Sequence, residues 1–198
     1  MRKTFFLIVL CLALTYQINA QKFKGGVQAG LLLTQVDGDD FNGYHKMGAF
    51  VGGFANIPFE EKKIQLQLEI DYAQKGSRAK MDYSMYKIRI HQIEMPFLFG
   101  WNFWKGFLLE IGPSFNFLVS AKEFNTLYGE LETENRFHLF ELGAVAGVGY
   151  RFQDHYGIGF RFNYSITSIG RMPVDRNGTT ITHNMWNNAL LFFAYYQF

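Results

Sequence analysis

The sequence is short of cysteine and proline, and neither sign of charge is in excess. Cys11 is the one cysteine and lies in an N-terminal apolar segment, so the rest of the chain has no thiol for a disulfide framework or a metal site. The 19 basic and 17 acidic residues become 17 and 17 once Arg2 and Lys3 are set aside. This balance argues against the basic surface of a nucleic-acid-binding protein. No apolar run is long enough for a transmembrane helix.

The N-terminus has the features of an export signal. Residues 1–3 are basic at two positions, residues 4–14 are apolar, and Ala20 offers the small side chain that signal peptidase requires. We therefore predict a cleaved signal peptide over residues 1–20 and a single domain over residues 21–198. An uncleaved anchor is the alternative, although the apolar segment is short for a bilayer.

The chain is rich in aromatic residues and glycine, with 22 Phe, 11 Tyr and 20 Gly against 4 Pro. Residues 63–72 alternate strictly between polar side chains at odd positions and apolar ones at even positions, and residues 157–166 alternate in a similar way. This period of two is typical of a β-strand whose faces meet different environments. The sequence therefore predicts an all-β fold.

Eight such segments are predicted as strands, at residues 22–35, 45–57, 63–72, 86–102, 107–121, 136–152, 156–168 and 184–198. The connections between them are alternately short (58–62, 103–106, 153–155) and long (36–44, 75–85, 122–135, 169–183). An even number of antiparallel strands, with short turns at one end and long loops at the other, is the pattern of an outer-membrane barrel. We predict an eight-stranded antiparallel up-and-down transmembrane β-barrel, with short periplasmic turns and longer extracellular loops. The terminal Phe198 suits recognition by the barrel assembly machinery.

The distribution of side chains between the two faces favours a membrane barrel over a soluble one. The polar faces carry Gln, Glu, Asp, Arg and Asn, which suit a barrel lumen better than a soluble core. Because an arginine costs about 2–4 kcal/mol at the lipid midplane, we expect Arg89 and Arg161 to point into the lumen. Aromatic residues near strand ends are expected at the membrane interface; these are Trp101, Trp104, Tyr150, Phe152 and Tyr196. A soluble barrel around an apolar pocket is the alternative.

Three short motifs carry a resemblance to a known family. Residues 93–99 read IEMPFLF, residues 110–113 read EIGP, and residues 143–150 read GAVAGVGY. In this order and spacing they resemble the PorT-like outer-membrane β-barrels, which are widespread in the Bacteroidota. The resemblance implies an eight-stranded outer-membrane barrel. For the family's namesake it also implies a link to a secretion system that exports gliding and protease cargo.

Several ionisable residues are expected to meet inside the barrel. If the third and fourth strands turn near Lys80, Asp71 lies opposite Arg89 and Glu69 lies opposite His91. The predicted lumen network consists of Glu69, Asp71, Arg89, His91, Glu110, Glu141 and Arg161. It could act as a proton or ion relay, but a plug of ion pairs is favoured, because an eight-stranded barrel is only wide enough for its side chains.

Metal, cofactor and catalytic sites are weakly supported. His91 and Glu94, like His138 and Glu141, are three residues apart, which places them on opposite faces of a strand; a bulge near Gln92 would alter the first pair. The loop sequence at 37–40, DGDD, offers oxygen ligands but lacks the spacing of an EF-hand. The Ser and His residues that a lipid-modifying enzyme would need are Ser84, His91, Ser165, Ser168 and His183. No spacing among them marks a nucleophile and its base, so no cofactor, metal or catalytic residue is predicted.

The expected function is non-catalytic. The barrel should contact outer-membrane lipid, and its exposed loops should bind a partner protein or a surface ligand. The loop residues predicted to make these contacts are Asp39, Asp40, Phe124, Tyr128, Arg171 and Arg176. A small ion or solute channel is the first alternative, and a lipid-modifying enzyme is the second.

Overall fold

The computed structural model describes residues 23–39, 43–59, 63–81, 84–131, 136–153, 155–176 and 179–198. The predicted signal peptide and the predicted contact Asp40 lie outside these residues. Ten strands make up the described part of the chain: β1 (Lys24–Asp37), β2 (Lys46–Phe59), β3 (Ile64–Met81), β4 (Ser84–Trp104), β5 (Phe107–Asn125), β6 (Gly129–Leu131), β7 (Phe140–Phe152), β8 (Tyr156–Ser165), β9 (Gly170–Arg176) and β10 (Thr179–Gln197).

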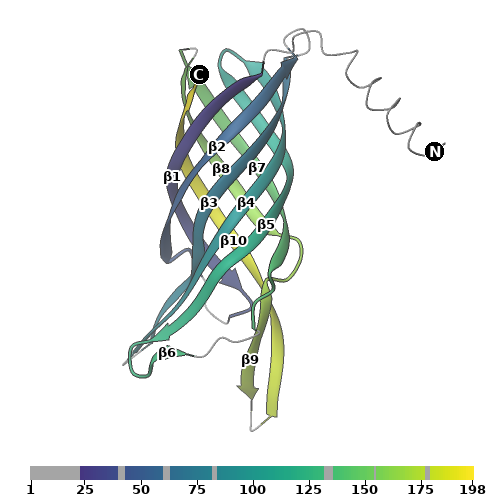
Figure 1. Ribbon diagram of the computed structural model, residues 1–198. Helices are drawn as coiled ribbons and strands as arrows, with labels where there is room; N and C mark the ends of the chain where they lie inside the picture. The colour runs from purple at the N-terminus through teal and green to yellow at the C-terminus, as the bar shows by residue number, and fades with distance from the viewer. Residues whose placement is uncertain are drawn as a thin grey trace, which may run out of the picture.

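Eight of these strands form a closed barrel (Figure 1). They follow one another in the order β1, β2, β3, β4, β5, β7, β8 and β10, and β10 pairs with β1 to complete the ring. The other two are arms, since β6 pairs with β5 and β9 pairs with β10. Every pairing is antiparallel, which confirms the predicted eight-stranded up-and-down barrel.

The two ends of the barrel differ (Figure 1). One end, here called the turn end, holds the start of β1, the end of β10 and the short connections after β2, β4 and β7. The other, the loop end, carries the extended hairpins and the arms β6 and β9. In outer-membrane barrels the short turns are periplasmic, so the loop end is the extracellular one. The described residues contain no helix with the length and apolar character needed to cross a bilayer.

The hairpin between β3 and β4 is longer than the sequence predicts. Residues 75–85 are predicted as a loop, but they continue the two strands until Met81 pairs with Ser84. The register therefore places Glu94 opposite Asp71 and Gly76 opposite Arg89. The predicted pairs of Asp71 with Arg89 and of Glu69 with His91 are wrong, because the turn lies beyond Lys80 and every partner moves by five residues.

A β-bulge interrupts the pairing of β4 with β5. His91 pairs with Ser120 and Gln92 pairs with Leu118, so Val119 is the extra residue. The side chains of β4 continue to alternate across this point, with Ile90, Gln92 and Glu94 all buried. The bulge near Gln92 thus lies in β5, where the extra residue changes which side chains face the lumen.

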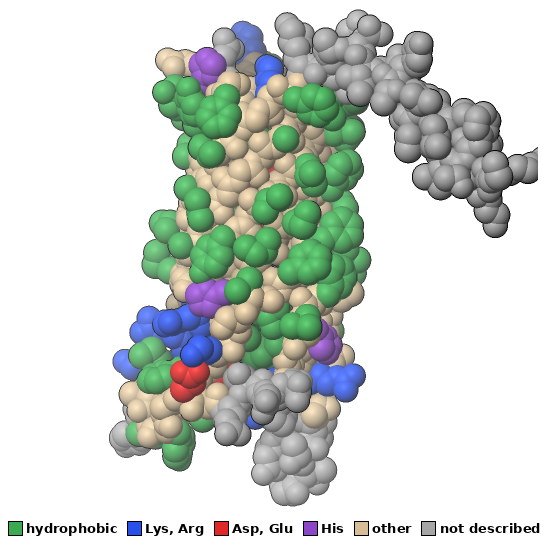
Figure 2. Space-filling model, in the orientation of Figure 1, with side chains coloured by type: hydrophobic (Ala, Val, Ile, Leu, Met, Phe, Trp, Pro, Cys, Tyr) green, Lys and Arg blue, Asp and Glu red, His purple; other side chains and the backbone are tan. Residues whose placement is uncertain are grey.

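Large apolar side chains cover the outside of the barrel between its ends, and green side chains occupy most of its height in Figure 2. Examples at least 42% exposed are Leu31, Val51, Leu68, Ile70, Phe97, Phe99, Leu109, Ile111, Phe115, Phe117, Ile158 and Phe192. We call this surface the apolar belt. The five predicted interfacial aromatics lie at the turn end of their strands, and each is 37–62% exposed. There Trp104 stacks on Phe107, with 5.7 Å between ring centroids.

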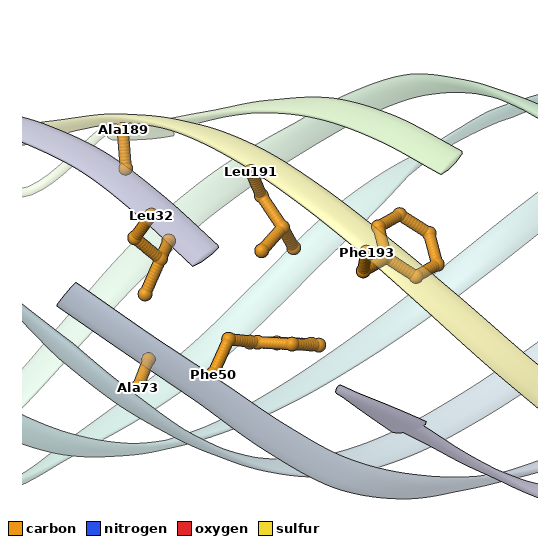
Figure 3. Close-up of a cluster of buried hydrophobic side chains, with 6 residues drawn as sticks. All are labelled: Leu32, Phe50, Ala73, Ala189, Leu191 and Phe193. Carbon is orange, nitrogen blue, oxygen red and sulfur yellow. The ribbon is translucent and has the colours of Figure 1, made fainter. Parts of the chain in front are cut away.

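The lumen also contains an apolar cluster (Figure 3). Leu32, Phe50, Ala73, Ala189, Leu191 and Phe193 pack together on the inner faces of β1, β2, β3 and β10. The lumen is therefore apolar on this side of the barrel. Through Phe193 the cluster contacts Arg161, the centre of the site described next.

Candidate functional site

Arg161 on β8 is the centre of a buried ion-pair network in the lumen. Its Nη1 and Nη2 atoms donate to the two carboxylate oxygens of Glu69 on β3, at 2.7 and 2.8 Å. Its Nε atom donates to Glu110 on β5 at 2.9 Å. The guanidinium carbon also lies 4.4 Å from the ring centroid of Phe193 in the apolar cluster. Arg161 is 1% exposed, and carboxylates from two other strands and one aromatic ring hold its guanidinium.

The sequence makes room for this arginine on the neighbouring strand. Gly147 on β7 pairs with Arg161, and a Cβ atom at Gly147 would lie only 2.6 Å from the Cγ atom of Arg161. Amide side chains complete the network, because Gln28 donates to both Glu69 (2.8 Å) and Asp71 (2.9 Å). The charges of Arg161, Glu69 and Glu110 are therefore paired and hydrogen-bonded, as charges in a low-dielectric interior must be.

A second network lies nearer the loop end. The Glu141 carboxylate accepts hydrogen bonds from Gln92 (2.6 Å), Ser165 (2.7 Å), Asn187 (2.9 Å) and Asn116 (3.1 Å). These donors come from β4, β8, β10 and β5.

Beside it, Lys75 on β3 forms an ion pair with Glu94 on β4, and both side chains are at most 2% exposed. Lys75 and Glu94 were not among the predicted lumen residues. Alternation along the strands is the sequence signal that would have identified them. Lys75 is four residues after the inward-facing Asp71 of β3, and Glu94 is two residues after the inward-facing Gln92 of β4, so both lie on the inner face.

These networks fill the lumen. At the turn end, the cavity lined by Gln28, Asn56, Glu110 and Arg161 among others has a volume of about 10 Å³. This is at the lower limit for holding even one water molecule.

The predicted network is only partly assembled in the structure. Glu69, Asp71, Glu110, Glu141 and Arg161 lie in the lumen, and each is at most 6% exposed. Arg89 and His91 instead lie on the outer face of β4, where Arg89 is exposed and His91 is partly buried. The Nδ1 atom of His91 lies 2.5 Å from the hydroxyl of Tyr72 on β3. The prediction that Arg89 and His91 face the lumen is wrong, because the barrel continues past the lipid and a charge there can face water.

An apolar plug occupies the interior of the loop end. Val36, Tyr86, Ile88, Ile90, Ile169 and Met185 are buried together there. Beside them, the hydroxyl of Tyr86 donates to Glu123 at 2.5 Å, and Arg136 Nη1 lies 3.0 Å from the same carboxylate oxygen. Burial and the neighbouring Glu123 carboxylate raise the pKa of Tyr86, so its hydroxyl stays protonated and acts as the donor.

The predicted loop contacts separate into exposed and buried positions. Phe124 (47% exposed), Tyr128 (78%) and Arg171 face solvent at the loop end. Asp39 is only 2% exposed, so its predicted role as a surface contact is wrong. Arg176 ends β9, where its backbone pairs with Thr179. The side chain of Arg176 and residues 177–178 lie outside the described part of the structure.

The serines and histidines considered for catalysis make other contacts. The Ser165 hydroxyl donates to Glu141, and the Ser168 hydroxyl donates to the carbonyl of Gly170. His138, which was considered with Glu141 for metal binding, has its Nδ1 atom 2.9 Å from the backbone carbonyl oxygen of Ser168. Among the described residues, no group of three or more His, Cys, Asp or Glu is placed to bind a metal ion.

Two solved barrels show the same arrangement of strands. Neisserial surface protein A is 12% identical, with a TM-score of 0.55, and the match covers 88% of this chain and 97% of that one. Ail, the attachment invasion locus protein of Yersinia pestis, in complex with the heparin analogue sucrose octasulfate, is 13% identical, with a TM-score of 0.52 and coverage of 89% and 99%. At these identities the likeness shows the fold. A comparison with curated proteins gives no match.

Residues 17–171 match the family model described as outer membrane protein beta-barrel domain. The matched segment begins before β1 and runs into β9, so it contains seven of the eight barrel strands. The predicted location in the outer membrane is thereby confirmed, and the chain belongs to the outer membrane protein beta-barrel domain family.

Proposed function

We propose that this barrel is a non-catalytic element of the outer membrane that binds a partner protein through its loop end. The observation that carries this proposal is the tip of the β5–β6 hairpin. There Leu127 is 62% exposed and Tyr128 is 78% exposed. The hairpin itself lies at the loop end of the barrel (Figure 1). Leu139, just before β7, is 76% exposed. Large apolar side chains held in water on projecting arms are typical of a surface that a partner covers.

The filled lumen supports binding over conduction. Among the described residues, side chains from several strands meet there in ion pairs and hydrogen bonds, and the turn-end cavity of about 10 Å³ is too small for a hydrated ion. We therefore expect no steady conductance from the purified barrel in planar bilayers. The hydroxyls of Ser165 and Ser168 donate to Glu141 and to the backbone of Gly170, so neither is paired with a histidine base as a lipid-modifying reaction would need.

A narrower proposal concerns the kind of partner. The three motifs that resemble PorT-like barrels fall on β4, β5 and β7, which are consecutive around the barrel. We propose on this basis that the chain is a PorT-like barrel, and that its partner belongs to a secretion or surface-assembly apparatus. Co-purification of such components with the barrel, lost when the hairpin tip is altered, is the expected result.

Site-specific photo-crosslinking in cells tests the main proposal. A photo-reactive p-benzoylphenylalanine at position 128 should give a discrete crosslinked protein on a denaturing gel. The same group at position 105, which replaces the exposed Lys105 at the turn end, is the matched control. Replacing Leu127 with serine should weaken the crosslink from position 128 if this tip is the contact. The proposal fails if position 128 gives no discrete product, or if positions 105 and 128 give the same one.

A further inference from the structure

The outer faces of β3, β4 and β5 form a regular grid at the loop end. Because the strands are paired in register, each level of the grid holds one residue from each strand. Moving away from the apolar belt, the levels are Tyr72–Ile93–Phe117, Gln74–His91–Ser120, Gly76–Arg89–Lys122 and Arg78–Lys87–Phe124. Two residues along a strand span about 7 Å, which sets the spacing of the levels. The character of the surface changes from apolar to polar to basic within three levels.

The basic levels bring like charges face to face. Arg89 pairs with Lys122 across β4 and β5, and Arg78 pairs with Lys87 across β3 and β4. Like charges directly opposite each other in a sheet are destabilising. Partial burial and the charges of Arg89 and Arg78 lower the pKa of Lys87, in keeping with this repulsion. An anion that bridges these pairs would convert the repulsion into attraction.

The same residues surround a groove of about 520 Å³. Its lining contains the cations Arg78, Lys87, Arg89 and Lys122, the carboxylates Glu123 and Glu130, and the apolar Met85 and Phe124. Glu123 is turned toward the plug and is bound by Tyr86 and Arg136, whereas Glu130 pairs with Lys122 at 2.8 Å. In Figure 2, blue side chains gather on this side of the barrel, directly below the green band. The groove is large enough for a phosphorylated sugar.

The position of the groove, next to the apolar belt, favours a lipid headgroup as the source of the anion. Ile93 and Phe117 belong to the apolar belt, and Arg89 and Lys122 lie two levels away on the same strands. A lipid with acyl chains against the belt would therefore carry its headgroup about 14 Å farther along the strands, or less along the membrane normal because the strands tilt. A soluble anion would gain nothing from this alignment.

We propose that the groove binds the phosphate groups of a phosphorylated glycolipid of the outer leaflet. Arg89 and Lys122 hold one phosphate, and Arg78 and Lys87 adjoin the sugar and its further phosphate. Glu130 competes with the ligand for Lys122. The site is separate from the hairpin tip at Leu127 and Tyr128, so it stands independently of the proposed partner protein.

Binding of lipid A to the purified full-length barrel in phosphatidylcholine nanodiscs tests the site. Replacing Arg89 and Lys122 together with glutamine should weaken lipid A binding about 30-fold, because each basic residue near an anionic lipid surface contributes about fivefold. The matched control removes two exposed cations at the turn end, by Lys63→Gln and Lys105→Gln, and should bind as the native protein does. The substitution Glu130→Gln should strengthen binding, since it frees Lys122.

Further arms separate the source of the anion and the folding of the variants. Dephosphorylated lipid A, and the phosphorylated disaccharide without acyl chains, should each bind much more weakly than lipid A. The double variant should keep the heat-dependent gel shift of a closed barrel and should melt at the same or a higher temperature without lipid A, because a like-charge pair is removed. Equal binding of dephosphorylated lipid A, equal binding of the soluble disaccharide, or unchanged binding by the double variant would each overturn the proposal.

Discussion

The membrane-spanning part of the barrel and its loop end are built with opposite polarity. Between the ends, ion pairs such as Arg161 with Glu69 lie inside, and the apolar belt lies outside. At the loop end, the apolar plug around Ile88 lies inside, and the cations Arg89 and Lys122 lie outside. In the spanning part the ion pairs are thus kept away from the surrounding lipid. At the loop end the cations Arg89 and Lys122 are kept out of the apolar plug.

A single strand, β4, passes through both arrangements. Its inner face changes from Ile88 and Ile90 to Gln92 and Glu94, while its outer face changes from Arg89 to Ile93. The change occurs at His91, beside the bulge in β5. The exchange of polar and apolar faces at His91 therefore marks the boundary between water and lipid on the outside of the barrel. The same kind of substitution should affect the free energy of unfolding differently on the two sides of this boundary.

The largest effect should come from the charge at the centre of the lumen. Replacing Arg161 with leucine leaves Glu69 and Glu110 buried without their cation, which should lower the free energy of unfolding by about 3–5 kcal/mol. Urea unfolding in lipid vesicles, followed by tryptophan fluorescence, measures this. The matched substitution Arg78→Leu at the loop end should change it by less than about 0.5 kcal/mol. An equal loss of free energy of unfolding from both variants would mean that the arginine in the lumen is no more important for stability than the arginine at the loop end.

The apolar plug should be the next most sensitive part. The Ile88 side chain is fully buried, so Ile88→Ala should lower the free energy of unfolding by about 3 kcal/mol through the cavity that it leaves. The control is Ile111→Ala in the apolar belt, where the side chain is 62% exposed and lipid can fill the space. A cost for the belt substitution as large as that for the plug substitution would contradict the assigned boundary.

An arginine transferred into the belt should be poorly tolerated. We expect Ile111→Arg to lower the free energy of unfolding by about 2 kcal/mol, because the guanidinium would meet acyl chains. The reverse exchange at the loop end, Lys122→Ile, should cost little, since Lys122 already faces a like charge on Arg89. The same vesicle unfolding assay compares the two, and a larger loss for Lys122→Ile would refute the boundary at His91.

The smallest effect should come from a single hydroxyl at the edge of the plug. Tyr86→Phe removes one donor to the buried Glu123 carboxylate but leaves Arg136 in place, so a loss of about 1–2 kcal/mol is expected. Tyr44→Phe is the control, because the hydroxyl of Tyr44 donates to the neutral amide of Asn188 in a partly exposed place. A greater loss from Tyr44→Phe would show that the charge of Glu123 is unimportant there.

The spanning strands could be predicted from the sequence because lipid and lumen impose opposite requirements on alternate residues. Residues 64–72 of β3 and Ile158, Phe160, Phe162 and Tyr164 of β8 follow this rule without exception. The lumen carboxylates Glu69 and Glu141 were predicted for the same reason. In this region a polar side chain can face only the lumen, so the face on which it lies follows from its polarity.

The loop end could not be predicted in this way. Once a strand leaves the membrane, a charge such as Arg89 can face outward, and an isoleucine such as Ile88 can face inward. Polarity at residues 75–85 suggested a loop, although the segment pairs as a hairpin. The register of that hairpin depends on where it turns, and an error of five residues, an odd number, exchanges the two faces. The bulge at Val119 depends on the pairing and leaves no comparable mark in the sequence.

The contacts of Arg161 have a consequence for how the chain enters the membrane. Its carboxylate partners come from β3 and β5, whereas Arg161 itself lies on β8. A partly assembled sheet would therefore hold Glu69, Glu110 and Arg161 apart, each facing hydrocarbon without its counter-ion. Such an intermediate is costly, so lipid insertion and closure of the ring between β1 and β10 are favoured as one event. The ion pairs of Arg161 can therefore form together only when the barrel is complete.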